Sequence, residues 1–262
     1  MIDNPNRDTR EDIRWKTLEL ALEKSRVPYD LDVSSFGSAP DRQIKQMREL
    51  GVEGNVYWSV TDRDWENASL PVRVPLSRGL NSYFNIWVAK KDVEKFSDIE
   101  TLDALTQFSV LQGTNWTTIP GLEAAGFDVR QGAFLNLVKM LAANRADALL
   151  YSAIQSARIE GLGSEELGLV PLPNLLIRFP LDDFFYVDAC SKDLHDAIFN
   201  GLMAAFEDGS YDAMMNSYPG VVEGYEVILS DAVKVLDVNN TQLTEESARV
   251  MDEYKLDAIL DR

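Results

Sequence analysis

Residues 108–153 alternate short apolar segments with amphipathic ones, and this alternation constrains the fold more than any other feature of the sequence. The segments FSVLQG, FDVRQG and ALLYSA have the length and composition of buried strands. Between them, IPGLEAAG and AFLNLVKMLAANRAD have helical patterns, and the second places Phe134, Leu137, Val138 and Leu141 on one face. Strands that alternate with helices over such short connections predict a parallel sheet with crossover helices.

The rest of the chain continues this alternation, so we expect an α/β protein with mostly parallel sheets flanked by helices. Helices are predicted over 9–27, over 39–50 and on both sides of Gly209, and strands over 29–33, 55–60 and 82–90. Residues 168–189 read as extended chain broken by prolines, and the tail from about 230 reads as a strand followed by an amphipathic helix.

Composition excludes several classes of function. The net charge of −18 repels nucleic acid and anionic lipid. Cys190 and His195 are the single cysteine and histidine, so neither an internal disulfide nor a Cys/His zinc site can form. We interpret Cys190 as a small buried hydrophobe and His195 as a structural or surface residue. With no nucleophile motif near His195, we predict no enzyme, no cofactor and no metal.

The sequence leaves the compartment open. It contains no apolar run long enough to cross a bilayer, and its start, MIDNPNRDTRED, has no apolar leader segment. A mature secreted protein expressed from a new Met would look the same.

The turn GTNWTT after the strand at 108–113 is a candidate binding loop. A parallel strand that feeds a helix start leaves backbone N–H groups pointing beyond the strand ends, which favours a carboxylate there. Thr114, Asn115, Thr117 and Thr118 add side-chain donors, and Trp116 adds a flat apolar wall. The alternative interpretation is simple N-capping by threonine with a packed tryptophan.

Five segments in order resemble the type II periplasmic solute-binding proteins, in the branch of amino-acid receptors of ABC transporters. They are WKTLELALEKSRVPYDLDV, VYWSVTDRDWENASLPVRVPLSRGL, FSVLQGTNWTTI, MLAANRADALLYSA and FFYVDACSKDLHDAIFNGLMAAFEDGSYDAMMNSY. The family has a strand before its first helix, where this sequence has only MIDNPN; either the native chain begins upstream or the strand is lost. The resemblance implies a two-lobe fold that captures a small solute between its lobes and catalyses no reaction.

The resemblance also implies ligand contacts in the first lobe. The family's loop there reads roughly Ser-x-Thr-x-x-Arg, and its arginine clamps the carboxylate of the ligand. Ser59 and Thr61 match, whereas Arg63 stands one residue early, and Arg78 is a second candidate cation.

In the second lobe, the family's amino-acid binders carry an acid that pairs with the ligand's ammonium. Here Tyr151 or Ser152 occupies that place and Asp147 lies at the strand start, which puts a standard α-amino acid in doubt. Trp58, Trp116 and Tyr151 are interpreted as aromatic pocket walls, with core packing as the alternative.

The expected lobes are 1–95 with 182–235, and 96–181, while 236–262 is an extension packed on the outside. Hinges are expected near 86–98 and 176–186. Asp182 and Asp183 are interpreted as a hinge cap or as solvent-facing residues rather than as a catalytic pair.

The predicted function is a monomeric periplasmic or extracellular receptor for a small polar ligand, amino-acid-like or carboxylate-bearing. Its expected partner is a membrane permease complex. A sensory module of the same fold, an enzyme on this scaffold and a degenerate protein that binds nothing are the alternatives.

Overall fold

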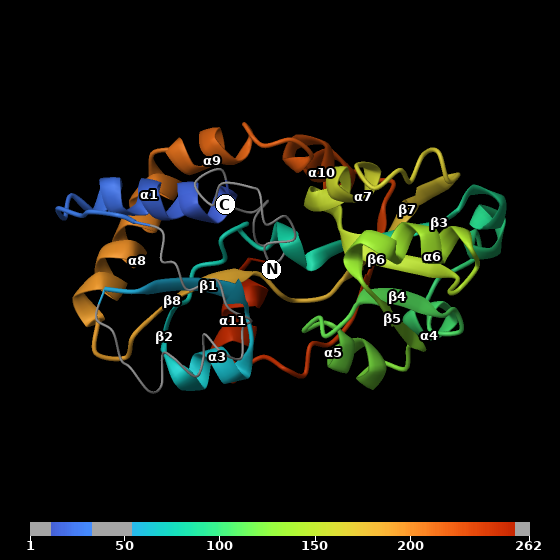
Figure 1. Ribbon diagram of the computed structural model, residues 1–262, viewed down its shortest axis with the longest axis horizontal. Coiled ribbons are helices and arrows are strands. Elements are labelled where there is room, and N and C mark those ends of the chain that lie inside the picture. The colour runs from blue at the N-terminus through green and yellow to red at the C-terminus, as the bar shows by residue number, and fades with distance from the viewer. Residues whose placement is uncertain (1–11, 33–53, 255–262) are drawn as a thin grey trace. The chain divides into compact units, whose positions relative to one another are not determined.

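The computed structural model describes residues 12–32 and 54–254, and it divides into two compact units (Figure 1). Unit 1 comprises 1–78, 182–218 and 243–262, and unit 2 comprises 79–181 and 219–242. The chain therefore passes between units after Arg78, Leu181, Tyr218 and Gln242. The predicted helix over 39–50 lies outside the described residues.

Unit 1 is built on a three-stranded antiparallel sheet in the order β1-β8-β2. The strands are β1 (Val56–Val60), β2 (Leu70–Val72) and β8 (Asp183–Val187). Alternate residues of β8 face opposite sides, because successive strand side chains point to opposite faces. Phe185 and Val187 pack into one core cluster, and Phe184 and Tyr186 into another.

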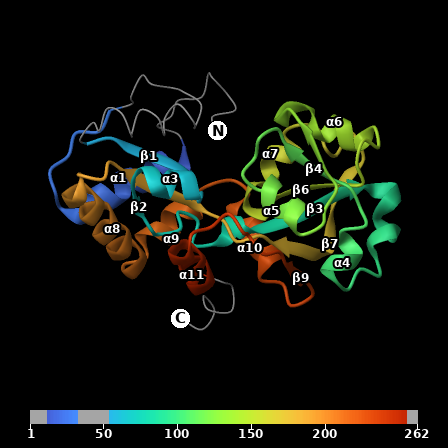
Figure 2. The same cartoon turned by 90° about the horizontal axis from the view of Figure 1, so that it is seen from below.

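Helices cover both faces of this sheet (Figures 1 and 2). On one face lie α1 (Ile13–Ser25) and α8 (Lys192–Glu207), which is followed by α9 (Ser210–Met215). Asp12 caps α1 by accepting a hydrogen bond from the Arg14 N–H at 2.9 Å. The two long helices approach closely because α8 has Gly201 at the contact, where a Cβ would overlap the carbonyl oxygen of Ala21.

On the other face of the sheet lie α3 (Arg63–Ala68) and α11 (Glu245–Glu253). Met251 of α11 is buried in the cluster formed with Trp65, Phe184 and Tyr186. The C-terminal helix is therefore a layer of unit 1 rather than an outer extension.

Unit 2 is built on a six-stranded sheet in the order β5-β4-β6-β3-β7-β9 (Figure 1). Its strands are β3 (Tyr83–Ala89), β4 (Val110–Gly113), β5 (Val129–Gly132), β6 (Ala148–Ser152), β7 (Leu169–Arg178) and β9 (Lys234–Asp237). The predicted strand–helix set over 108–153 is confirmed: β4 pairs in parallel with both β5 and β6.

Helices of unit 2 are short. They are α4 (Leu102–Leu105), α5 (Ile119–Ala124), α6 (Leu137–Ala142), α7 (Ser156–Glu160) and α10 (Val221–Ile228), with 3-10 turns η2 (Leu80–Ser82), η3 (Lys90–Phe96), η4 (Phe134–Asn136) and η5 (Ala153–Gln155). Leu137, Val138 and Leu141 of α6 are buried against the sheet, as their spacing predicts.

Four sequence expectations need correction. Unit 1 has an antiparallel sheet, and β3 runs antiparallel to β6 and β7, so the sheets are mixed rather than mostly parallel. Residues 83–89 belong to the sheet of unit 2, so they form neither part of the first lobe nor a hinge at 86–98. Residues 219–242 also belong to unit 2, while 243–254 return to unit 1. Tyr29–Asp32 form no strand, because no partner strand pairs with them among the described residues.

Candidate functional site

The candidate residues divide between the units. Trp58, Ser59, Thr61, Arg63 and Arg78 lie in unit 1, and Thr114, Asn115, Trp116, Thr117 and Tyr151 lie in unit 2. Each set is described within its own unit.

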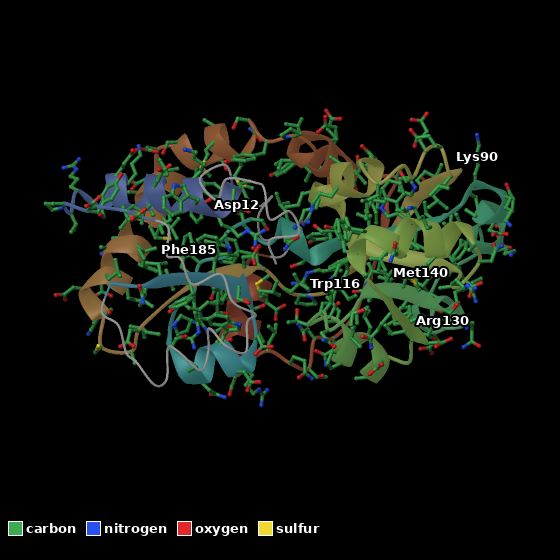
Figure 3. The ribbon with its side chains drawn as sticks, in the orientation of Figure 1. Asp12, Lys90, Trp116, Arg130, Met140 and Phe185 are labelled. Atoms are coloured by element: carbon green, nitrogen blue, oxygen red, sulfur yellow. The ribbon has the colours of Figure 1, made fainter. Side chains whose placement is uncertain are left out.

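The loop after β4 positions Trp116 (Figure 3). Asn115 takes a left-handed backbone conformation with φ 62, which turns the chain sharply after the strand. A Cβ on Gly113 would overlap the indole ring of Trp116, so glycine is needed for the ring to lie against the strand end. The position of the indole is therefore set by the backbone of its own loop.

The expected free N–H groups of this loop are partly occupied. The N–H of Thr114 donates to the Gly132 carbonyl at 2.9 Å, that of Asn115 to Gln131 Oε1 at 3.3 Å, and that of Trp116 to the Gly113 carbonyl at 3.1 Å. β5 (Val129–Gly132) supplies two of these acceptors and Gly113 the third, so carboxylate capture by these three N–H groups is not supported. The hydroxyl of Thr118 donates to Gln112 Oε1 at 2.5 Å and does not cap α5, contrary to the N-capping alternative.

Three aromatic rings gather where β4, β5 and β6 end. The ring centroids of Trp116 and Tyr151 are 5.8 Å apart, those of Phe134 and Tyr151 5.7 Å, and those of Trp116 and Phe134 6.3 Å. Tyr151 is buried, whereas Trp116 and Phe134 are half-buried. Phe134 packs against the core cluster of unit 2, as its place on the predicted core face implies. Its position two residues beyond β5 also brings it to the other two rings.

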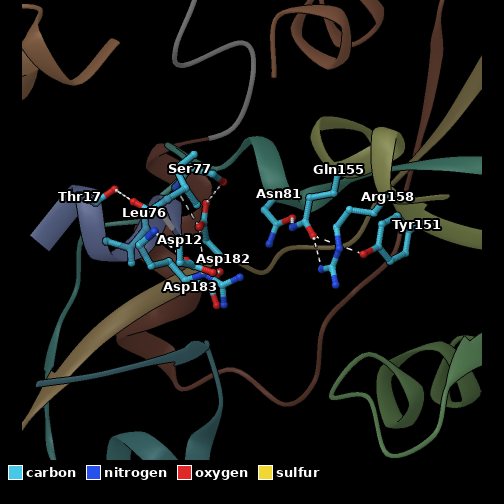
Figure 4. Close-up of polar contacts among 12 residues, drawn as sticks. Asp12, Thr17, Leu76, Ser77, Asn81, Tyr151, Gln155, Arg158, Asp182 and Asp183 are labelled. Atoms are coloured by element: carbon cyan, nitrogen blue, oxygen red, sulfur yellow. Dashed lines mark hydrogen bonds and ion pairs between the residues drawn. The ribbon is translucent and has the colours of Figure 1, made fainter. Parts of the chain in front are cut away.

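A polar edge adjoins these rings (Figure 4). The Tyr151 hydroxyl lies 3.5 Å from Gln155 Oε1, and Gln155 Nε2 donates to Asn81 Oδ1 at 2.9 Å. Arg158 Nη1 donates to Gln155 Oε1 at 3.4 Å, and the guanidinium lies 4.9 Å from the centroid of the Phe134 ring. We call Trp116, Phe134, Tyr151, Gln155 and Arg158 the aromatic–guanidinium cluster.

Sequence reasoning missed Arg158 and Asn81. Arg158 follows Gln155 within one helical turn, a spacing that brings two side chains together, but the partner ring comes from a distant loop. Ser152, one of the two residues expected at the place of the acid, is buried, and its hydroxyl has no hydrogen-bond partner in the described chain. The carboxylate of Asp147 accepts hydrogen bonds from the N–H and hydroxyl of Ser109 at 2.8 and 2.6 Å. These bonds join the start of β6 to the start of β4.

In unit 1, Trp58 packs against the core cluster beneath α1 and α8, which favours the packing interpretation of its ring. Ser59 follows it on β1 and is half-buried. Thr61 is buried, and its N–H donates to the Asp182 carbonyl at 2.8 Å. Asp62 caps α3 by accepting from the Asp64 N–H at 2.6 Å, and burial raises the pKa of this carboxyl above its ordinary 3.8.

Both candidate arginines of unit 1 have partners inside that unit. Arg63 Nη2 donates to the Leu243 carbonyl at 2.9 Å, although the residue is exposed. Arg78 Nη1 lies 2.8 Å from Asp212 Oδ1, and its guanidinium lies 5.3 Å from the centroid of the Phe206 ring. A ligand contact from either arginine stays a prediction, and it would compete with these contacts.

Asp182 is buried and organises the chain at two of the crossing points (Figure 4). Its carboxylate accepts from the N–H and hydroxyl of Ser77, at 3.0 and 2.5 Å, and from the N–H of Asp183 at 2.8 Å. The carboxylate of Asp183 faces a different residue: its Oδ2 lies 3.8 Å from Arg14 Nε. The two acids thus have separate structural partners and do not form a pair.

Cys190 is exposed, and its thiol donates to Asp188 Oδ1 at 2.8 Å, so the expectation of a buried hydrophobe is wrong. This hydrogen bond lowers the pKa of Asp188. His195 stacks on Phe199 on the half-exposed side of α8. In the part of the chain that the structure describes, no three His, Cys, Asp or Glu side chains gather as metal ligands.

Comparison with solved structures decides the fold. An ancestral arginine-binding protein bound to arginine matches with a TM-score of 0.54 and 16% identity, over 81% of this chain and 91% of that one. This chain has the type II periplasmic-binding-protein fold.

Two further structures share this binding-protein fold. A Streptococcus pneumoniae substrate-binding protein of an amino-acid ABC transporter, bound to L-arginine, matches with a TM-score of 0.51 and 14% identity, over 77% of this chain and 80% of that one. A histidine kinase sensor domain, similar to periplasmic binding proteins, matches with a TM-score of 0.53 and 14% identity, over 80% of this chain and 87% of that one. No family model matches the sequence, and no curated protein matches it.

Among the described helices, none has both the length and the apolar character required to span a bilayer.

Proposed function

We propose that this chain is an extracytoplasmic solute-binding protein that captures a small polar, amino-acid-like or carboxylate-bearing ligand for an ABC-type transporter. The observation that carries the proposal is the fold, which it shares with proteins solved with arginine bound, one of them a substrate-binding protein of an ABC transporter. Those neighbours are binding proteins rather than enzymes, which fits a protein that performs no reaction.

The candidate contacts follow strand ends in each unit. In unit 1 we propose ligand contacts from Ser59 on β1 and from Thr61 and Arg63 just after it, with Trp58 and Arg78 as further candidates. In unit 2 we propose contacts from Thr114, Asn115, Trp116, Thr117 and Tyr151. Loops at the carboxyl ends of strands are where α/β folds place ligands. A ligand that binds one conformation of the protein better than another would favour that conformation, which a permease complex would recognise.

A thermal-shift screen against amino acids, carboxylates, polyamines and short peptides tests the proposal. A ligand at about 100 times its dissociation constant adds roughly 2.7 kcal/mol to the free energy of unfolding. We expect Arg63→Gln and Trp116→Phe to weaken binding at least about tenfold, a loss of roughly 1.4 kcal/mol. Arg249→Gln on α11 is the matched control, because Arg249 is 69% exposed and pairs with Glu253.

If both site variants bind like the parent, the assignment of these residues fails. If no small solute stabilises the parent, solute capture itself is contradicted.

A sensory module is the second candidate, because a histidine kinase sensor domain shares the fold. Uptake of the identified ligand by cells with and without the gene separates the two. Loss of uptake supports delivery to a transporter, whereas unchanged uptake with a lost transcriptional response supports sensing.

A further inference from the structure

The C-terminal part of the chain runs through one unit and then returns to the other. Residues 219–242 belong to unit 2, and the chain from 243 onward belongs to unit 1. Units that are joined only by flexible segments move and unfold independently by default. Whether this default holds here depends on how firmly the last crossing, between Gln242 and Leu243, is anchored on each side.

In unit 2, the segment before this crossing is part of the sheet. β9 pairs in parallel with β7, from Leu175 opposite Lys234 to Arg178 opposite Asp237. The contact continues one residue further, because the Val238 N–H donates to the Arg178 carbonyl at 2.8 Å and Val238 is buried. Hydrogen bonds to β7 therefore hold the chain as far as Val238.

Asn240 anchors the chain two residues before the crossing. It is buried, its Nδ2 donates to the Pro180 carbonyl at 2.8 Å, and its Oδ1 accepts from the Gln242 N–H at 3.0 Å. Pro180 precedes Leu181, after which the chain makes an earlier crossing. Breaking either bond would leave a buried polar group unpaired, so Asn240 ties two of the crossing segments together within unit 2.

In unit 1, the anchor begins directly after the crossing. Leu243 is buried in the cluster that contains Trp65, and its carbonyl accepts from Arg63 Nη2 at 2.9 Å. Thr244 caps α11, and its hydroxyl donates to Glu66 at 2.7 Å. The first residue of this segment in unit 1 is therefore already part of the core.

Between the buried anchors Asn240 and Leu243 stand only Thr241 and Gln242. The three peptide links that join these anchors span at most about 10 Å. A short tether holds each end near its binding site at a high effective concentration, which falls as a flexible tether is lengthened. Each anchor thus favours formation of the other.

We propose that residues 238–244 form a strap that couples the unfolding of the two units, so that a loss of stability in one core is transmitted to the other. This inference concerns the folding of the chain and does not rest on the proposed solute-binding function.

Lengthening the strap tests the coupling. A flexible Gly-Ser insert of about twelve residues between Gln242 and Leu243 lengthens the crossing and leaves the partners of Asn240 and Leu243 in place. The control carries the same insert between Asp231 and Ala232, two exposed residues that both belong to unit 2. Hydrogen exchange across a urea series then follows peptides from β8 for unit 1 and from β4 for unit 2.

A core truncation in unit 1 supplies the perturbation. Leu202→Ala removes part of a fully buried side chain of α8. In the parent and in the control insert, we expect it to lower the urea midpoints of both β8 and β4. In the long-strap chain it should lower the midpoint of β8 alone. Ile198→Val, a smaller truncation in the same cluster, serves if Leu202→Ala does not fold.

Three outcomes overturn the proposal. They are an unchanged β4 midpoint in the parent background, an equal β4 shift in the parent and the long-strap chain, and loss of the β4 shift in the control insert. None of them bears on the thermal-shift screen for solutes, so the two proposals fail separately.

Asn240→Asp tests the anchor in unit 2. It removes the amide donor to Pro180 and keeps an oxygen for the Gln242 N–H. We expect the α11 amides to exchange about tenfold faster relative to the β4 amides of the same chain, because α11 loses the effect of its tether. Asn239→Asp makes the same charge change at an exposed neighbour and should alter neither rate. Unchanged α11 exchange in Asn240→Asp would contradict coupling through this anchor.

Discussion

At the scale of single residues, the loop after β4 depends on Gly113. Because a Cβ there would overlap the Trp116 indole, we expect Gly113→Ala to displace the ring and lower the free energy of unfolding by about 1–3 kcal/mol. Urea denaturation measures the loss, and tryptophan fluorescence reports the displacement. In a Trp116→Ala background the same glycine substitution should cost much less. Equal costs in both backgrounds would show that the overlap is not the cause.

A second residue-scale prediction concerns Asp182. Asp182→Ala leaves the N–H and hydroxyl of Ser77 and the N–H of Asp183 without this acceptor. Since each buried donor left unpaired costs about 1–3 kcal/mol, we expect a loss of at least about 3 kcal/mol in chemical denaturation. Ser77→Ala removes only the hydroxyl bond to this carboxylate and should cost about 1.5 kcal/mol, at the low end for a hydrogen bond to a charged group because two N–H donors remain. A loss no larger than that of Ser77→Ala would contradict the role assigned to Asp182.

At the scale of elements, a pH-dependent contact joins the end of α1 to the end of α8. Lys24 hydrogen-bonds Asp208 and, with Ser210, lowers the pKa of that carboxyl from 3.8 to about 2. A lowered pKa in the folded state stabilises the protein above the unfolded value, and the effect is lost as pH falls through about 2.

We therefore expect Lys24→Gln to raise the pKa of Asp208 towards 3.8, as measured by NMR titration of the carboxyl group. The difference in melting temperature between the parent and this variant should be constant above about pH 4 and shrink towards pH 2. Lys139→Gln on α6 makes the same change in net charge and should leave the Asp208 titration unaltered. An unshifted titration in Lys24→Gln would contradict the contact.

The docking of α11 is a further element-scale property. Thr244 accepts from the Ser247 N–H at 3.2 Å and caps the helix, and its hydroxyl donates to Glu66 at 2.7 Å. Met251 is 1% exposed, so Met251→Ala should cost about 2–5 kcal/mol in chemical denaturation. Arg249→Ala on the exposed side should cost less than about 0.5 kcal/mol. Similar small losses from both would mean that α11 does not stabilise unit 1.

At the scale of the whole molecule, the net charge of −18 opposes folding through self-repulsion. Raising NaCl from 10 to 150 mM shortens the Debye length from about 30 Å to about 8 Å, so we expect the melting temperature at pH 7 to rise by a few degrees. Near the isoelectric pH of about 4.4 the rise should vanish. A fall in melting temperature with salt at pH 7 would show that attractive ion pairs outweigh the repulsion.

The sequence by itself determined the α/β class, most helices and strands, and the turn after β4. These features depend on local periodicity, on glycine and on capping residues, which act within a few positions of the chain. The same local signals also indicated that Trp116 and Tyr151 would lie at strand ends.

Only the tertiary structure decided which residues meet there. Phe134 and Arg158 lie 24 residues apart and join through the order of strands in the sheet, which the local pattern does not encode. The tertiary structure likewise placed residues 83–89 in unit 2 and gave Arg63 and Arg78 their partners in unit 1. Strand pairing and side-chain packing join distant segments, so their outcome is set by the free energy of the whole fold rather than by any one segment.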